Sequence, residues 1–153
     1  MSGVAHPNIT AVALGGRALL LSGPPGNGKS SLALALIDRG AVLIGDDGVM
    51  LESGEGVVMA HPPGPTGGLI EVRNVGLVRL PVTSAPVALL LRLMPDAPRF
   101  ADAADETELC GIPVPALAFA PGDAVQALRA EYALRTYGLR DACPSKMTEH
   151  EAR

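Results

Sequence analysis

The sequence has 153 residues and a net charge of −4, which indicates one domain large enough for a hydrophobic core. Hydrophobic residues make up 48% of the chain but aromatic residues only 3%, so we expect a core of Ala, Val, Leu and Ile, as in a buried sheet. The acidic balance and the lack of a basic cluster argue against nucleic-acid binding. Cys110 and Cys143 are too few for a disulfide framework or a metal cage. Because neither a signal peptide nor an apolar run of about 20 residues is visible, we expect a cytoplasmic protein with no membrane contact.

The start of the chain predicts a hairpin. Residues 1–8 have the character of a lead-in, and residues 9–14 and 18–22 are apolar enough to form strands. Gly15 and Gly16 lie between the two segments and favour a tight turn. The second strand would therefore run back beside the first.

Residues 23–30 match the phosphate-loop pattern G-x-x-x-x-G-K-[ST], with an apolar strand before them and an apolar helix after them. Glycines let successive backbone N–H groups surround a phosphate, and the start of the helix adds partial positive charge. Lys29 can reach the β- and γ-phosphates, and the Ser30 hydroxyl can bind Mg²⁺. The sequence therefore predicts a nucleotide site formed by Gly23, Pro24, Pro25, Gly26, Asn27, Gly28, Lys29, Ser30 and Ser31.

The middle of the chain alternates strands with turns. The helix after the phosphate loop is expected to stop at Gly40, and residues 41–44 form a short buried strand. Residues 49–60 predict a second hairpin, and residues 61–68 are too rich in Pro and Gly for anything but a loop.

The second half contains fewer clear signals. Further expectations are an extended segment at 69–73, a central strand at 87–93, an acidic surface loop at 95–108, a proline-interrupted segment at 112–120, a helix at about 124–135 capped by Asp123, and a polar tail at 141–153.

Three carboxylates are candidates for the chemistry. Asp46 and Asp47 follow the strand after the phosphate-loop helix, where such folds hold Mg²⁺ or its water, and one of the two could accept a proton from an attacking hydroxyl. The alternative is an ordinary acidic turn. Glu71 lies in an apolar segment, where a charge is costly unless it has a partner or a metal. Arg73 is expected on the same face, so an internal ion pair is an equal alternative for Glu71. His6 and His61 by themselves would be surface residues.

The order of the motifs is informative. His6 precedes the glycine-turned hairpin, and the phosphate loop, Arg39-Gly40, the Asp46-Asp47 pair and residues 70–76 (Ile-Glu-Val-Arg-Asn-Val-Gly) follow. This order resembles the catalytic domain of the HPr kinase/phosphorylase family, in its short, single-domain alphaproteobacterial form. The segment 70–76 is the specific mark, because it is similar to the family signature L-E-[IV]-R-x-[LV]-G and ordinary phosphate-loop proteins lack it.

The resemblance implies roles for individual residues. Lys29 and His6 would be active-site residues, Asp47 would take the seryl proton with Asp46 beside it, and Ser30 and Glu71 would bind Mg²⁺. It implies ATP as phosphoryl donor, an HPr-type phosphocarrier protein as acceptor, inorganic phosphate for the reverse reaction, a PEP-carboxykinase-like nucleotide site and a homo-oligomer, by family a hexamer.

We therefore expect an α/β P-loop nucleotide-binding domain with a mixed sheet and few helices over residues 1–140, followed by a disordered tail at 141–153. The expected function is that of an ATP-dependent serine kinase acting on HPr, with phosphorylase activity as a second possibility. The alternatives are a nucleotide-sensing regulatory module without catalysis and a P-loop kinase of a small molecule. Gly48 and Asp123 favour the regulatory alternative, because longer relatives carry a basic residue after the Asp pair and an arginine in the segment corresponding to 121–124.

Overall fold

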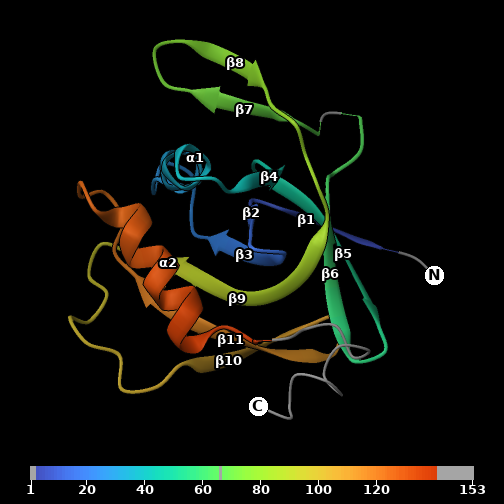
Figure 1. Ribbon diagram of the computed structural model, residues 1–153, viewed down its shortest axis with the longest axis vertical. Helices are drawn as coiled ribbons and strands as arrows, with labels where there is room; N and C mark the ends of the chain where they lie inside the picture. Colours follow the sequence, from blue (N-terminus) through green and yellow to red (C-terminus); the bar gives the residue numbers. More distant parts are fainter. Residues whose placement is uncertain (1–2, 66, 141–153) are drawn as a thin grey trace.

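The computed structural model describes residues 3–65 and 67–140. Eleven strands and two helices follow one another in the described part, and Figure 1 shows their arrangement. They are β1 (Val4–Pro7), β2 (Thr10–Leu14), β3 (Arg17–Ser22), α1 (Lys29–Asp38), β4 (Val42–Gly45), β5 (Gly48–Gly54), β6 (Val57–His61), β7 (Leu69–Val72), β8 (Gly76–Arg79), β9 (Ala85–Leu93), β10 (Asp105–Leu109), β11 (Ile112–Phe119) and α2 (Gln126–Tyr137).

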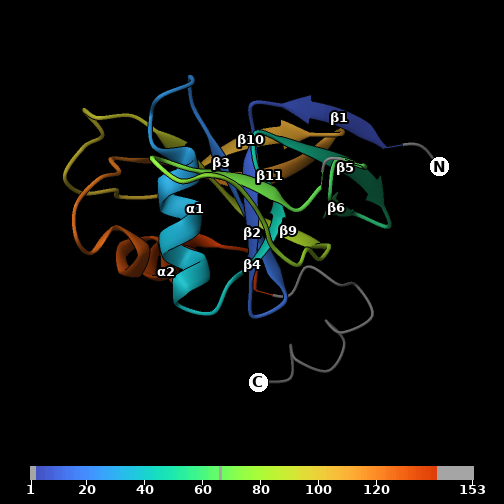
Figure 2. The ribbon, with the colours of Figure 1, turned by 90° about the horizontal axis from the view of Figure 1, so that it is seen from above.

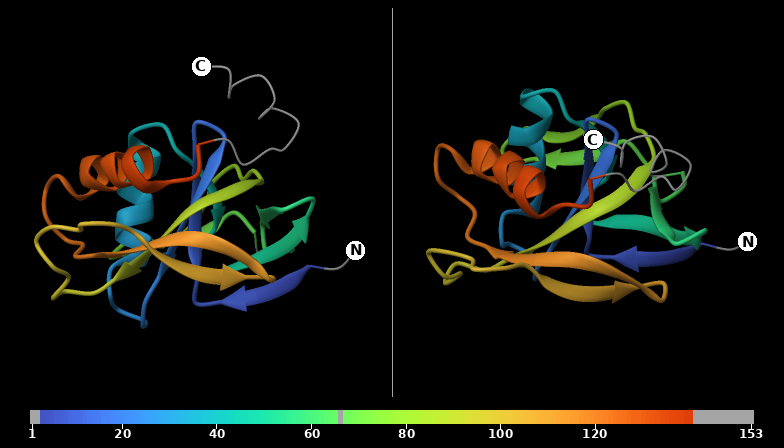
Figure 3. Two further views of the ribbon diagram at one scale, coloured as in Figure 1. Left: turned by 90° about the horizontal axis from the view of Figure 1, so that it is seen from below. Right: turned by 60° about the horizontal axis from the view of Figure 1, so that its bottom comes forward.

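One strongly curved sheet organises the molecule. Its strands run in the order β1-β5-β6-β9-β3-β2-β4, and β11 with β10 joins it through β9. The central strand β9 pairs in parallel with β3 and β11, and antiparallel with β6 (Figure 3). The sheet is therefore mixed, and β9 holds its parts together.

Both faces of the sheet are buried. Leu19 and Leu21 of β3 face the cluster that contains α1 and α2, whereas Leu20 faces a second cluster inside the curve formed with β5, β6, β10 and β11. This division follows from the alternation of side chains along a strand. Leu32 and Leu36 of α1 are fully buried against the first face. Figure 2 shows α1 on one side of β2 and β3, with α2 beside it. The aliphatic core expected from the composition is confirmed.

The hairpin β7–β8 forms a separate two-stranded sheet beyond α1 (Figure 1). Ile70 is fully buried in the first cluster, while Val75 and Leu77 are 71% and 69% exposed. The hairpin thus covers the outer side of α1 with one face and presents apolar side chains on the other.

The local predictions are largely confirmed. The two hairpins β2–β3 and β5–β6 form, α1 ends at Asp38 with Gly40 at φ +112°, and β9 is central. The predicted fold class, an α/β P-loop domain with a mixed sheet and few helices, is confirmed. The helices of the described part contain 10 and 12 residues, and neither is long and apolar enough to cross a membrane.

Two strands form where the sequence predicted a lead-in or a loop, and a third forms beyond the predicted extended segment. Residues 4–7 become β1 by pairing with β5, residues 76–79 become β8, and the acidic segment ends in β10. Each depends on a partner strand that its own sequence does not reveal. His61 also ends β6 and does not belong to the following loop.

The proline-interrupted segment forms β11 although it contains Pro113 and Pro115. Residues two apart in a strand direct their backbone nitrogens to the same side, so Pro113 and Pro115 face the same edge of β11. Strand β9 pairs with that edge only from Ala116 onward, so no hydrogen bond is lost at the two prolines, which have no N–H. Helix α2 begins two residues later than predicted, and the predicted cap is wrong: Val125 precedes the helix without a side-chain cap, while Asp123 accepts a hydrogen bond from the Val125 N–H (3.1 Å). The predicted tail and Cys143 lie outside the described residues, and Cys110 is half-buried.

Candidate functional site

The phosphate loop connects β3 to α1 at the end of the central strands. Gly26 and Gly28 have φ values of +87° and +90°, which side chains with a Cβ rarely adopt, and Gly28 directly precedes α1. Asn27 holds the loop to the sheet, because its Nδ2 donates to the Leu93 carbonyl of β9 (3.0 Å). The loop therefore has the backbone conformation that lets N–H groups converge on an anion.

Lys29 supplies a cation that has no anionic partner within the described residues. The side chain is only 6% exposed, and its Nζ donates to the carbonyls of Gly23 (2.6 Å) and Pro24 (3.3 Å). A buried ammonium held only by neutral carbonyls leaves positive charge that an anionic ligand can neutralise. Lys29 thus favours a phosphate at the loop.

The carboxylate of Asp46 connects three elements. Its Oδ1 accepts hydrogen bonds from the Ser30 hydroxyl (2.6 Å) and the Thr10 hydroxyl (3.1 Å), and its Oδ2 accepts one from the Glu71 N–H (3.3 Å). Ser30 comes from α1, Thr10 from β2 and Glu71 from β7. A hydroxyl and a carboxylate in contact beside a phosphate loop are the protein ligands that P-loop enzymes use for Mg²⁺.

Asp47 lies next to this group in a different environment. Its backbone has φ +62°, its N–H donates to Thr10 Oγ1 (3.0 Å), and its carbonyl accepts from the Asn8 N–H (3.2 Å). These two contacts fix the left-handed backbone, while the side chain is exposed. Asp46 is therefore engaged with Ser30, whereas the Asp47 carboxylate is exposed and makes no hydrogen bond or ion pair among the residues that the structure describes.

His6 is less closely connected. It lies half-buried in β1 opposite Val49 of β5, the strand that begins directly after the Asp pair. His61 lies elsewhere on the sheet, with Nε2 2.9 Å from Glu52 Oε1 and Nδ1 2.8 Å from Ser84 Oγ. The structure thus brings His6 to the strand beside the Asp pair and engages His61 in a separate contact.

The argument from burial for Glu71 is wrong. Its side chain is exposed, because β7 has only one face on the core and Ile70 occupies that face. The alternative of an internal ion pair with Arg73 also fails, since no ion pair joins the two residues within the ranges described, and both are exposed. What brings Glu71 to the site is its backbone N–H on Asp46.

A cleft of about 530 Å³ opens beside the phosphate loop. It is lined by Gly26, Asn27, Gly28, Ser31, Pro95, Pro121, Gly122 and Gln126. Four of these residues belong to the loop or the start of α1, and the others come from segments that follow β9 and β11. The cleft gives room for a ligand that is larger than a phosphate.

Sequence reasoning missed Thr10, which joins Asp46 to Asp47 and is completely buried. The available signal was a lone hydroxyl within an apolar strand, where a polar group requires a partner. It also missed the second half of the cleft, which lies about 70 to 100 residues from the loop in sequence and carries no motif. In the described ranges no three His, Cys, Asp or Glu side chains converge as a complete protein cage for a metal.

Comparisons with known proteins agree with this geometry. The sequence profile described as "HPr Serine kinase C-terminal domain" matches residues 5–83. The chain is 41% identical over 66 residues to the HPr kinase/phosphorylase of Clostridium acetobutylicum, and 45% identical over 64 residues to that of Bordetella pertussis. These alignments include 43% and 41% of this chain, but only 22% and 21% of the relatives' own length.

A solved structure extends the likeness of the fold. The structure titled "Structure of the Hpr(Ser) kinase/phosphatase from Coxiella burnetii" superposes with a TM-score of 0.75 at 24% sequence identity. The superposition covers 86% of this chain and 94% of the other. The profile match contains the phosphate loop, the Asp pair and the β7 strand that meet at Asp46, and with it the chain belongs to the HPr serine kinase C-terminal domain family.

Proposed function

We propose that this chain is an ATP-dependent serine kinase that phosphorylates an HPr-type phosphocarrier protein. The observation that carries the proposal is the division of roles between the two aspartates: Asp46 accepts the Ser30 hydroxyl beside the phosphate loop, while the neighbouring Asp47 carboxylate is exposed. Binding of a nucleotide with its metal requires a hydroxyl and a carboxylate beside the phosphate loop. Phosphoryl transfer to a serine also requires a carboxylate that can accept the proton of its hydroxyl. Membership in the family supports HPr as the acceptor.

In the proposed reaction the seryl oxygen of the acceptor bonds to the γ-phosphorus, and the bond from that phosphorus to the bridging oxygen of ADP breaks. The proton of the seryl hydroxyl passes to Asp47. Lys29 and the N–H groups of the loop stabilise the negative charge on the phosphates, so that catalysis consists mainly of positioning and charge neutralisation. His6, in the strand beside the Asp pair, is proposed as a further active-site residue.

Mg²⁺ fits the residues present. This ion ordinarily combines one or two protein ligands with phosphate oxygens and waters, and does not require a full protein cage. Ser30 and Asp46 would hold it, with the exposed Glu71 side chain as a further ligand from β7. When bound, the ion would neutralise charge on the β- and γ-phosphates.

We also propose phosphorolysis as a weaker second activity, in which inorganic phosphate takes the phosphoryl group from phosphoserine and Asp47 returns the proton to the serine. Asp123 occupies the place of an arginine in longer relatives, so the reverse reaction is expected to be slower than transfer from ATP. The same difference favours the alternative of a nucleotide sensor without catalysis.

We further propose that the chain forms a homo-oligomer and acts in the cytoplasm, where ATP and phosphocarrier proteins are found. The exposed Val75 and Leu77 on the β7–β8 hairpin support the first point, since large exposed apolar groups favour an interface. Light scattering on the purified chain tests it: a monomer at micromolar concentration would contradict it.

The experiment that tests the function is transfer of labelled γ-phosphate from ATP to purified HPr, with ATP binding measured in parallel. The wild-type chain is expected to label a serine, the Asp47→Asn variant to bind ATP without labelling HPr, and the Lys29→Ala variant to lose both. If the wild-type chain binds ATP but leaves HPr unlabelled, the kinase proposal is wrong and the sensor takes its place. Labelling of a small metabolite in place of HPr would support the small-molecule kinase.

A further inference from the structure

In the proposed nucleotide complex, the cleft beside the phosphate loop and the group around Asp46 contact different ends of the nucleotide. Neither Lys29 nor Ser30 belongs to its lining, because Lys29 turns to the carbonyls of Gly23 and Pro24, and Ser30 turns to Asp46. These two side chains act on the β- and γ-phosphates and their metal. The cleft therefore receives what remains of the nucleotide, which is the α-phosphate and the nucleoside.

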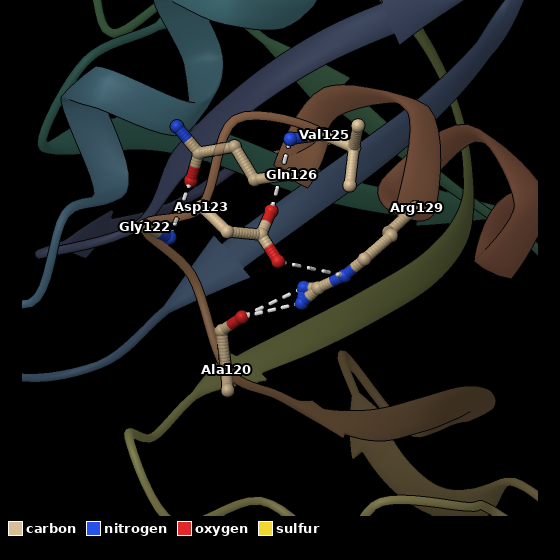
Figure 4. Close-up of polar contacts among 6 residues, drawn as sticks. All are labelled: Ala120, Gly122, Asp123, Val125, Gln126 and Arg129. Atoms are coloured by element: carbon tan, nitrogen blue, oxygen red, sulfur yellow. Dashed lines mark hydrogen bonds and ion pairs between the residues drawn. The ribbon is translucent and has the colours of Figure 1, made fainter.

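The far wall of the cleft is formed by the connection from β11 to α2 and is held in place by side chains of α2. Arg129 donates to the Ala120 carbonyl (2.8 Å) and lies 3.7 Å from the Asp123 carboxylate. Figure 4 shows these contacts together with the hydrogen bond from the Val125 N–H to Asp123. The connection is thus fixed before any ligand binds.

Gln126 has a fixed orientation in this wall. The N–H of Gly122 donates to its side-chain carboxamide at 2.8 Å. Because a backbone N–H can only donate, the oxygen Oε1 must face Gly122, and the NH₂ group must point the other way. Figure 4 shows the amide nitrogen directed away from Gly122, and no hydrogen bond from it is found within the described ranges. Gln126 therefore offers a pre-oriented donor in a cleft where the phosphate loop is the opposite wall.

Two proline rings give the cleft apolar sides. Pro95 and Pro121 both line it, and Pro121 lies directly over the loop, since a Cβ placed on Gly28 would be 3.7 Å from Pro121 Cγ. Apolar walls combined with a few oriented polar groups are typical of sites for planar organic ligands, whereas a phosphate site consists of N–H groups and cations. The chemistry of this end of the cleft suits a nucleobase.

We propose that Gln126 is a specificity-determining residue that donates a hydrogen bond from Nε2 to the base of the bound nucleotide, between Pro95 and Pro121. This inference rests on the proposed nucleotide site and adds the means by which the chain distinguishes a nucleotide from an inorganic polyphosphate. The lone donor selects bases that present an acceptor at that edge.

The test is calorimetric binding of ATP and of inorganic triphosphate, without HPr, to the wild-type chain and to two variants. Gln126→Leu removes both the contact to Gly122 and the donor. Gln126→Glu keeps an oxygen for the Gly122 N–H but has no donor. In both variants the ratio of ATP affinity to triphosphate affinity is expected to fall about 5-fold. This corresponds to about 1 kcal/mol, the contribution of one hydrogen bond. The added charge of Gln126→Glu weakens triphosphate at least as much as ATP, because triphosphate has a free charged terminus where ATP has its ribose ester, so a fall in the ratio cannot come from charge.

Thr136→Leu is the matched control, since Thr136 lies on the same helix, exposed and 10 residues further on, about 15 Å along the axis. It should leave the ratio unchanged. If Gln126→Glu restores the wild-type ratio, Gln126 only positions Gly122 and the inference is wrong. Equal losses for both ligands would also refute it, because the contact would then be to phosphate. If the wild-type chain binds neither ligand, the proposed nucleotide site itself fails. Thermal unfolding of each variant shows that it is folded, and Gln126→Glu, which keeps the contact to Gly122, decides between the two roles.

Discussion

Replacing Thr10 by valine tests whether the two aspartates depend on one buried hydroxyl. Thr10 is completely buried, donates to Asp46 (3.1 Å) and accepts from the N–H of Asp47 (3.0 Å). Valine has nearly the same shape, so the change removes the hydroxyl without opening a cavity.

The expected loss follows from the two contacts. The Asp47 N–H would be left without its partner, which costs about 1–3 kcal/mol. Loss of the hydrogen bond to the Asp46 carboxylate costs about 1.5–3 kcal/mol more, less what the remaining donors to that carboxylate compensate. One additional buried methyl group offsets about 1 kcal/mol. We expect a net loss of about 2–3 kcal/mol in the free energy of unfolding, or about 5–10 °C in Tm.

The assay is urea unfolding followed by circular dichroism, because the chain has no tryptophan and only two tyrosines. Thr10→Ser is the matched control: it keeps the hydroxyl and removes one buried methyl group, at about 1 kcal/mol. The valine variant should also bind Mg-ATP more weakly, and the serine variant should not. Equal stability of the valine variant and the wild type, or a larger loss in the serine variant, would refute the reasoning.

Further expectations concern the site and its support. Ser30→Ala should weaken Mg-dependent ATP binding at least about 10-fold, since the proposed metal site loses its hydroxyl ligand and Asp46 keeps only the Thr10 hydroxyl; an equal loss in titrations with EDTA would show that the serine does not act through the metal. Gly45→Ala should unfold at much lower urea concentration or fail to fold, because a Cβ there would meet backbone. Hydrogen bonding from Arg39 lowers the pKa of Glu131, so the ion pair that joins α1 to α2 stabilises the fold fully above the unfolded-state pKa and less as the pH falls through the lower folded-state value. The Tm difference between wild type and Glu131→Gln should therefore shrink as the pH falls below about 4.5, and a difference that grows on acidification would contradict this sign.

The parts that the sequence predicts well have local causes. The glycines of the phosphate loop, the turn at Gly15 and Gly16, and the stop at Gly40 each act within a few residues, and each occurs as expected. Asp46 could be predicted because the strand after the phosphate-loop helix ends beside the loop in this kind of fold.

The parts that the sequence does not predict depend on distant partners. Residues 4–7 form a strand only because β5 lies beside them, and Gln126 faces the phosphate loop across the cleft only because α2 packs against α1. The contacts that join Asp46 and Asp47 run through Thr10, whose own sequence context is simply apolar. Glu71 shows the opposite error, since the apolar neighbours that suggested burial occupy the other face of its strand.

The central position of β9 has a consequence for how the molecule folds. Every residue of the phosphoryl site precedes residue 83, but β3, which leads into the phosphate loop, pairs in parallel with β9, and Asn27 of the loop is held by the last carbonyl of that strand. During synthesis the loop leaves the ribosome before the strand that holds it. Parallel pairing over such a long separation forms slowly, because a long loop must close first. We therefore expect the phosphate loop to acquire its final geometry late in folding.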